Sequence, residues 1–193
     1  MPPAAVATAW SAFQAATWNG RQTFALARAA KDREHSTQAR AQGDQQSTLD
    51  VALFVAWAKA YQHHDDVFAT FLYDRFPPRL KKATDAWLAT APFGSSDGPA
   101  HPFALPEYQT EAHARADALA TQADDEVAAG VAANRQSDTY VLATVIFATV
   151  ILLATIGLRL QRRSTRRTLL ILTALTLFVS TAWVAARPVA WVG

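Results

Sequence analysis

Residues Tyr140–Ala186 read YVLATVIFATVILLATIGL, then RLQRRSTRR, then TLLILTALTLFVSTAWVAA. The two apolar runs, Tyr140–Leu158 and Thr168–Ala186, have 19 residues each and contain no Asp, Glu, Lys, Arg, His or Pro. At about 1.5 Å per residue, a helix of this length crosses the roughly 30 Å hydrocarbon core of a bilayer. The stretch therefore predicts a transmembrane helical hairpin, with spans at about 140–158 and 168–186 and a loop at 159–167.

The charges of the chain are separated along its length. Residues 1–138 hold all 16 acidic residues and 12 of the 18 Lys and Arg, which gives this part a net charge of −4. Residues 139–193 hold the other six basic residues and no acid. Because the larger part is mildly acidic, the overall excess of basic residues gives no indication of nucleic-acid binding. The chain has no Cys, which excludes a disulfide framework, a thiol nucleophile and a thiolate metal site.

The basic link between the two runs predicts the orientation of the hairpin. It contains five arginines: Arg159, Arg162, Arg163, Arg166 and Arg167. The positive-inside rule places such a short basic loop in the cytoplasm, where the same side chains would contact anionic lipid head groups. Both outer ends of the hairpin then face the exterior, where Trp183 and Trp191 fit an interfacial aromatic belt. We therefore expect a multi-pass protein of the bacterial inner membrane, with residues 1–138 mostly periplasmic or extracellular.

An extracytoplasmic domain of this size has to cross the membrane, yet the first residues, MPPAAVATAW, lack the basic region of a signal peptide. The apolar run 4–18 is diluted by Thr, Ser and Gln and is too short for a full span. One alternative is a domain that stays cytoplasmic, against the charge rule. Our hypothesis is that Pro3–Trp18 is the outer end of a first spanning helix that begins upstream of Met1. In-frame upstream codons for about ten apolar residues would support it, and an immediate stop codon would contradict it.

The N-terminal region, residues 1–41, is predicted to be one long helix, because residues 4–41 contain no Pro and a single Gly. Its apolar face is made by Trp10, Phe13, Thr17 and Phe24. Gly43 predicts a turn at 42–46, which separates this helix from the next region.

Residues 42–138 are predicted to form an extracytoplasmic helical domain. Ser47-x-x-Asp50 is a helix-start signal with an acid in the first turn, and Pro77-Pro78 ends the helix that follows. That helix carries an amphipathic stripe: Leu49, Leu53, Trp57, Tyr61, His64, Phe68, Phe71 and Leu72. A short helix is expected next, at 79–90.

The Pro-rich segment 92–106 is expected to be an ordered loop, held on the bundle by Phe93, Phe103 and Leu105; a mobile loop is the alternative. Residues 107–158 contain no Pro and predict one continuous helix, about 80 Å long, that runs into the membrane. Its packing positions recur at steps of four and three: Ala112, Ala116, Leu119, Ala123, Val127, Val131 and Asn134. These mostly small side chains would let the helix at 4–41 approach closely.

The only cluster of His and carboxylates is His63-His64-Asp65-Asp66. Adjacent His on a helix point about 100° apart and seldom share a metal ion, so we interpret His64 as a packed core residue and both Asp as solvated. The acidic run 124–126 lacks the glycine turn of a calcium loop and is interpreted as a solvated face. No P-loop, GxGxxG, GxSxG or HExxH motif occurs. No catalytic, cofactor-binding or metal residue is therefore assigned.

The two predicted spans contain no ionisable residue, which argues against a proton relay or coupled transporter made from this hairpin alone. Stripes of small and hydroxyl residues are typical of helix packing in membranes, and lining a pore is the alternative. The stripes are Thr144, Ala148 and Thr155 in one span and Thr173, Thr176 and Ser180 in the other.

Several short motifs occur in a fixed order: ATAWSAFQ (7–14) with WNG (18–20), FLYDRFPP (71–78), Lys82 with AWL (86–88), PFALPEY (102–108) and SDTYVL (137–142). In these motifs the chain resembles a family of uncharacterised small bacterial integral-membrane proteins, a domain of unknown function. The resemblance implies three spanning helices, the first just before and through 7–14, with an extramembrane domain between the first and the second. It implies no activity, substrate or cofactor, and His63-His64 lies outside the family's pattern.

These observations predict an all-α integral membrane protein, with a C-terminal transmembrane hairpin at 139–193 and an extramembrane helical bundle. The leading hypothesis is a non-enzymatic envelope protein that assembles with itself, as a homo-oligomer, or with other membrane proteins. The alternative is a pore-forming or transport subunit built by oligomerisation around the hydroxyl stripes. An enzyme that uses the cluster His63–Asp66 is a third hypothesis, which bound metal lost on His64→Ala would support.

Overall fold

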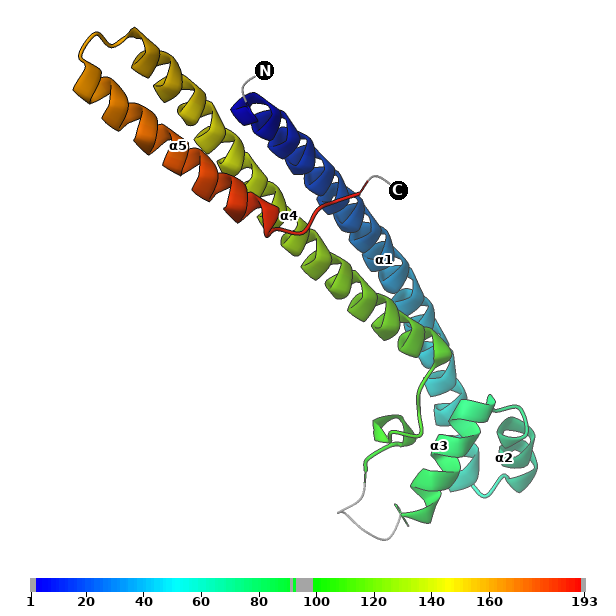
Figure 1. Cartoon of the computed structure of the whole chain (residues 1–193). Helices are drawn as coiled ribbons and strands as arrows, with labels where there is room; N and C mark the ends of the chain where they lie inside the picture. The colour runs from blue at the N-terminus through cyan, green and yellow to red at the C-terminus, as the bar shows by residue number, and fades with distance from the viewer. Residues whose placement is uncertain (1–2, 91, 93–98, 192–193) are drawn as a thin grey trace. The chain divides into compact units, whose positions relative to one another are not determined.

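The structure, a computed structural model, describes residues 3–90, 92 and 99–191. Within these ranges the regular elements are all helical, which confirms the predicted all-α class (Figure 1). They are α1 (Pro3–Gln62), α2 (Asp66–Tyr73), α3 (Pro78–Ala89), the 3-10 helix η1 (Pro102–Ala104), α4 (Glu111–Arg159) and α5 (Arg163–Ala185). Of these described helices, α4 and α5 are long and apolar enough to cross a membrane.

The chain divides into two compact units. The hairpin unit contains residues 1–29 and 124–193, and the aromatic unit contains residues 30–123. Each unit takes one part of α1 and one part of α4. The boundary predicted between residues 41 and 42 therefore falls inside helix α1.

Helix α1 is continuous from Pro3 to Gln62, so the predicted turn at 42–46 and the helix start at Ser47 are wrong. Gly43 has a different role from the one expected of it. A Cβ atom at this position would lie 2.4 Å from Cδ2 of His113 on α4, so only Gly allows the imidazole to lie this close. Asp50, expected in an exposed first turn, is 1% exposed instead.

The side of α1 that packs is made mainly of small residues. Its buried and half-buried positions recur at alternating steps of four and three: Ser11, Ala15, Trp18, Gln22, Ala25, Ala29, Asp32, Ser36, Ala39, Gly43, Gln46 and Asp50. This seven-residue period is the coiled-coil pattern. The large side chains predicted to form an apolar face do not form the packed side, since Trp10, Phe13 and Phe24 are 42%, 47% and 70% exposed.

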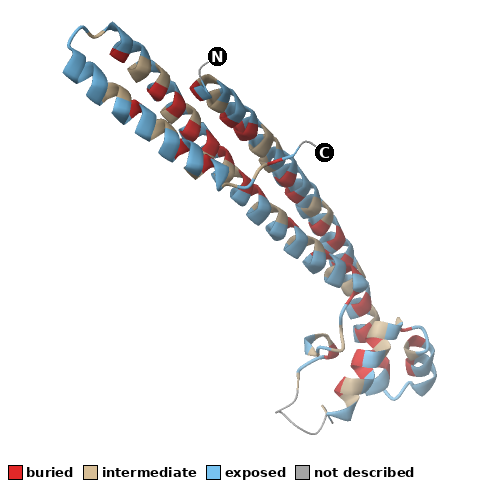
Figure 2. Cartoon of the chain, viewed as in Figure 1, coloured by how far each residue is buried: buried red, intermediate tan, exposed pale blue. Residues whose placement is uncertain are grey.

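Helix α4 confirms the predicted continuous helix, and it packs against α1 in both units (Figure 2). In the aromatic unit, the hydroxyl of Ser36 donates to the carbonyl of Ala116 at 2.8 Å. In the hairpin unit, the hydroxyl of Ser137 donates to the carbonyl of Ala15 at 3.0 Å. Gly130 lies against Leu26, so this glycine too serves a close approach of the helices.

The helix predicted up to Pro77 ends earlier, at Gln62. His64 adopts a left-handed backbone, with φ 58°, and the N–H of Asp65 donates to the carbonyl of Ala60 at 3.0 Å. These two features form a Schellman-type C-cap, in which the left-handed position is usually Gly. The Asp65 side chain then caps α2 by accepting from the N–H of Phe68 at 3.1 Å. The stripe predicted across this point is thus broken, and His64 is exposed, not packed in the core.

We expect His64→Gly to stabilise the chain by about 1 kcal/mol, because Gly adopts the left-handed conformation without the steric cost that His bears there. His64→Val should destabilise it, since a β-branched side chain fits this backbone least well. Thermal unfolding of the two variants against the wild type measures both effects. Loss of stability in His64→Gly would show that the imidazole, not the backbone conformation, matters at this position.

The connections before α3 and between α4 and α5 are short. Pro77 precedes α3, as predicted, and residues 160–162 join α4 to α5, so the helical spans extend into the predicted loop at 159–167. Phe103 and Leu105 pack on the aromatic core, as expected for an ordered loop. Phe93, the third side chain expected there, lies outside the described residues.

Candidate membrane interface

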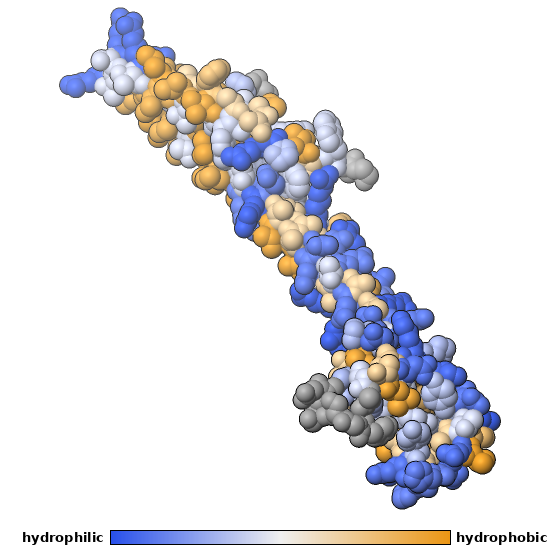
Figure 3. Space-filling view, turned by 90° about the horizontal axis from the view of Figure 1, so that it is seen from below, coloured by the Kyte–Doolittle hydropathy of each residue, from blue (hydrophilic) through white to orange (hydrophobic). Residues whose placement is uncertain are grey.

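The surface of the hairpin is covered by large apolar side chains. On α4 the exposed ones are Val141, Leu142, Val145, Leu152, Ile156 and Leu158, and on α5 they are Ile171, Leu172, Leu175, Phe178 and Val179. Figure 3 shows hydrophobic residues gathered over this end of the chain, next to the hydrophilic arginine link. Only 22% of the most apolar window of α4 and 17% of that of α5 are buried, so these helices are not packed as the core of a water-soluble fold is.

The beginning of α1 packs into the same unit. A buried cluster joins Ala15 of α1 to Tyr140, Ala143 and Phe147 of α4 and to Val184 of α5. On the other side of α1, Val6 is 61% exposed, and Trp10 and Phe13 are about half exposed. The first four turns of α1 therefore combine a packed side of mainly small residues with an apolar outer side.

The segment after α5, residues 186–191, is fixed across the unit by hydrogen bonds; we call it the C-terminal strap. Gln14 is fully buried, and its side-chain amide pairs with the backbone of Ala190 in both directions, at 3.2 and 2.8 Å. The hydroxyl of Tyr140 donates to the carbonyl of Pro188 at 3.0 Å. Arg21 donates to the carbonyl of Trp191 at 3.0 Å. The bonds of Gln14 and Tyr140 satisfy buried polar groups among apolar side chains, whereas the bond of Arg21 is exposed.

Tryptophan and arginine side chains pair near the strap. The guanidinium of Arg21 lies 4.9 Å from the ring centroid of Trp18, and that of Arg187 lies 4.8 Å from that of Trp183. Trp and Arg at the ends of apolar helices are typical of membrane–water interfaces, where an amphipathic ring meets the head groups.

At the other end of the hairpin, all five link arginines are exposed, and none forms an ion pair within the described chain. The side chains of Arg163, Arg166 and Arg167 belong to the first turns of α5. They remain candidates for anionic head groups. The two ends of the apolar surface are thus each marked by cationic side chains.

The hydroxyls of the predicted stripes are engaged within their own helices. Thr173 donates to the carbonyl of Leu169 at 2.7 Å, and Ser180 donates to that of Thr176 at 2.7 Å. Thr144 and Thr155 do the same one turn back on α4. Thr173 and Ser180 are each 6% exposed, which is the position of a packing residue.

Family models, curated proteins and solved structures give no match to this chain. The resemblance based on the ordered motifs therefore stays a prediction.

The His and carboxylate cluster serves the turn between α1 and α2. Across the described ranges, no three His, Asp or Glu side chains come together in a way that could hold a metal ion. In the acidic run 124–126, Glu126 accepts two bonds from the Arg28 guanidinium at 2.8 and 2.9 Å, which lowers the pKa of Glu126. This carboxylate is an ion-pair partner between α1 and α4, not only a solvated group as predicted.

The sequence reasoning missed a buried ionic network in the aromatic unit. Asp50 of α1 accepts two bonds from Arg79 of α3, at 2.7 and 3.1 Å, and one from the hydroxyl of Tyr108 at 2.9 Å. Burial raises the pKa of Tyr108, and the hydrogen bond to Asp50 adds to the effect. The network connects α1, α3 and the segment before α4. The sequence signal for this network was the position of Asp50, which continues the seven-residue pattern of packed residues on α1.

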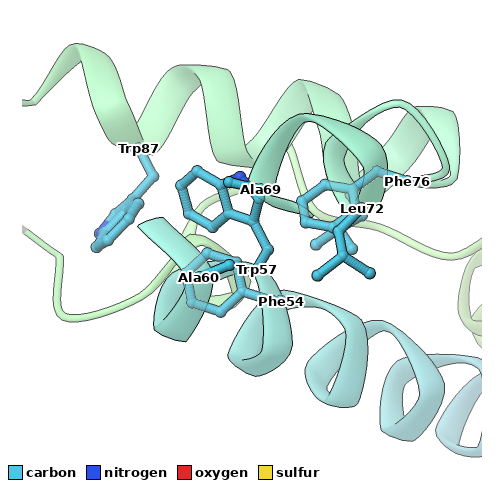
Figure 4. Close-up of a cluster of buried hydrophobic side chains, with 8 residues drawn as sticks. Phe54, Trp57, Ala60, Ala69, Leu72, Phe76 and Trp87 are labelled. Carbon is cyan, nitrogen blue, oxygen red and sulfur yellow. The ribbon is translucent and has the colours of Figure 1, made fainter. Parts of the chain in front are cut away.

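An aromatic core lies next to this network. The ring of Phe54 packs edge-on against Trp87 and Phe103, with centroids 5.4 and 5.5 Å apart. Figure 4 shows Trp57 beside Phe54 and Trp87, between α1 and α3. The indole N–H of Trp87 donates to the carbonyl of Pro99 at 2.8 Å. Such edge-on ring pairs add directional contacts to the burial of apolar area.

The stability of this unit should fall at alkaline pH through Tyr73. Burial, with the hydrogen bond that its hydroxyl donates to Asp85, raises the pKa of Tyr73 to about 12. The unfolded chain releases this proton near pH 10 while the folded chain keeps it, so the free energy of unfolding decreases from pH ~10 to ~12. Thermal unfolding of wild type and Tyr73→Phe across this range measures the effect. The stability difference between them should shrink as the pH rises; a constant difference would contradict the assignment.

Proposed function

We propose that this chain is a non-enzymatic protein of the bacterial envelope, whose hairpin unit lies in the cytoplasmic membrane and assembles with itself or with other membrane proteins. The observation that carries the proposal is the apolar surface on α4 and α5, most of which the chain leaves uncovered. At about 25 cal/mol per Å², exposing such a surface to water would be strongly unfavourable, whereas lipid and neighbouring membrane helices match it.

The beginning of α1 supports a third membrane-embedded helix beside the hairpin. Pro3 and Ala4 line a groove together with Val150, Ala154 and Leu170, well inside the apolar runs. The exposed Val6, Trp10 and Phe13 continue the apolar surface. With the arginine link in the cytoplasm, the aromatic unit then lies on the periplasmic or extracellular side.

Grooves along the helices support assembly. One of about 340 Å³ is lined by Ile146, Thr176, Ser180 and Trp183, and another of about 360 Å³ runs beside Ala154 and Ala174. Small residues at such grooves let a further helix approach closely. Because the hydroxyls of Thr173 and Ser180 donate to their own helix, they favour packing over the lining of a pore.

Mass photometry of the full chain in detergent tests the proposal. We expect particles that hold more than one chain, and Thr176→Trp, which fills the first groove, should reduce them to single chains. Thr149→Trp adds the same ring at an exposed position of α4 outside these grooves and outside the small-residue stripe, and should leave the mass unchanged. A wild type that is monomeric and carries no second protein would overturn the assembly proposal.

A further inference from the structure

A third groove lies between α1 and α4 of the hairpin unit, near the strap. It has a volume of about 380 Å³ and is lined by Trp18, Arg21, Phe24, Ala25, Arg28, Ala129 and Ala133. Unlike the apolar grooves along the hairpin, it combines aromatic rings with guanidinium groups. Phe24 is 70% exposed at its edge, where a soluble fold would place a polar residue.

Two donors of this groove lack a full set of partners. Among the described residues no carboxylate pairs with Arg21, whose hydrogen-bond partner is the neutral carbonyl of Trp191. The indole N–H of Trp18 is buried and has no partner there either. The exposed guanidinium of Arg21 suits an oxyanion, because it only donates hydrogen bonds, whereas the indole N–H of Trp18 is buried and would be reached only if the ring moved.

The position of the groove along the helices indicates which oxyanion. Helices α1 and α4 run antiparallel here, because Ala15 contacts Ser137 and Ala25 lies by Gly130. Arg21 is therefore level with a point about seven residues before Tyr140, roughly 10 Å from the start of the predicted span. The head-group layer extends roughly 5–7 Å beyond the hydrocarbon core. Since the Arg21 side chain lies over Trp18, it reaches back toward that layer.

We propose that this groove binds the phosphate of a phospholipid head group, with Arg21 as its principal donor. The inference rests on the proposed membrane placement of the hairpin unit. It adds a lipid site on the outer face, separate from the arginine link.

Photo-crosslinking in phosphatidylcholine liposomes tests the site, using phosphatidylglycerol with a diazirine on its head group. Labelling should reach the peptides around residues 18–28 and 129–133 in the full chain. Arg21→Gln should lower this labelling about tenfold or more relative to labelling at the arginine link of the same molecules, because charge-assisted bonds are lost. Arg187→Gln is the matched control: Arg187 also lies over a Trp ring, but outside the groove, so labelling should stay within about twofold.

A second variant blocks the groove without changing charge. Ala129 is exposed on α4, so Ala129→Phe should fill the space without disturbing the core and should also reduce the labelling. Unchanged labelling in Arg21→Gln and Ala129→Phe would overturn the inference. Loss of labelling on addition of inorganic phosphate would show that the groove binds free phosphate and would overturn the proposed lipid ligand. Lipid with the diazirine on its acyl chain should label α5 in every variant, and its failure to do so would refute the membrane placement itself.

Discussion

Arg79→Met is expected to lower the free energy of unfolding of the aromatic unit by about 3–5 kcal/mol, because it leaves the buried carboxylate of Asp50 without its charged partner. The Asp50 side chain is 1% exposed, whereas that of Arg79 is 28% exposed. The free-energy cost of breaking the pair therefore comes mainly from the buried, unpaired carboxylate. Tyr108 alone then donates to it.

Two control variants separate charge from packing and hydrogen bonding. Tyr108→Phe removes one hydrogen bond and should cost about 1 kcal/mol. Arg40→Met breaks an exposed pair with Asp117, whose side chains are 58% and 67% exposed, and should change stability by less than about 1 kcal/mol. Amide hydrogen exchange in α3 of the full chain, in detergent, reports the local free energy of opening. Equal effects of Arg79→Met and Arg40→Met would refute an energetic role for the buried network.

Phe178→Arg is expected to keep α5 from spanning the membrane in most molecules, while α4 still anchors the chain. Phe178 is 74% exposed and lies near the middle of the second apolar run. An arginine at the centre of a spanning helix costs about 2.5–3.5 kcal/mol in insertion, which corresponds to roughly a hundredfold shift of the equilibrium. In water the same substitution at so exposed a position would have almost no effect.

Val67→Arg provides the matched control, because Val67 is 84% exposed on α2 of the aromatic unit. Expression in bacteria with a reporter enzyme that is active only outside the cytoplasm, fused after residue 193, measures how often α5 spans the membrane in each variant. Val67→Arg should give the same reporter activity as the wild type. If Phe178→Arg gave it too, the assignment of α5 as a spanning helix would have to be abandoned.

The helices that the sequence predicted well are those set by composition and by Pro. The apolar runs and the Pro-free stretch 107–158 describe α4 and α5, and Pro77 places the start of α3. Each of these signals is local. Whether a stretch of sequence contains a Pro or a charge is seen from that stretch alone, so no knowledge of tertiary contacts is needed to predict these helices.

The packing side of α1 could not be read in the same way. Ala is frequent on every side of this helix, so the sequence shows where the large side chains lie but not which side packs, and Trp10 and Phe24 face outward. From the local sequence, Gly43 predicts a turn. Its presence inside a helix is explained by His113, whose ring lies where a Cβ atom of residue 43 would be. A search for a seven-residue period of small residues would have identified the packed side.

The buried network was beyond local reasoning for a related reason. Asp50 finds Arg79 and Tyr108 far along the chain, and nothing in its neighbourhood distinguishes it from a solvated helix-start residue. The groove at Arg21 has the same origin, since it needs side chains from α1 and α4 together. In both cases the chemistry arises where distant segments meet.

The pairing of Gln14 with Ala190 has a consequence for biosynthesis. The two residues are 176 positions apart, so the amide of Gln14 is without its partner until nearly the whole described chain has left the ribosome. In the proposed lipid environment an unpaired amide is costly, which favours docking of the N-terminal helix after the hairpin has been made. Closure of the hairpin unit by the strap therefore waits for the synthesis of residue 190, and a translation product stalled before residue 186 would lack the partner of Gln14.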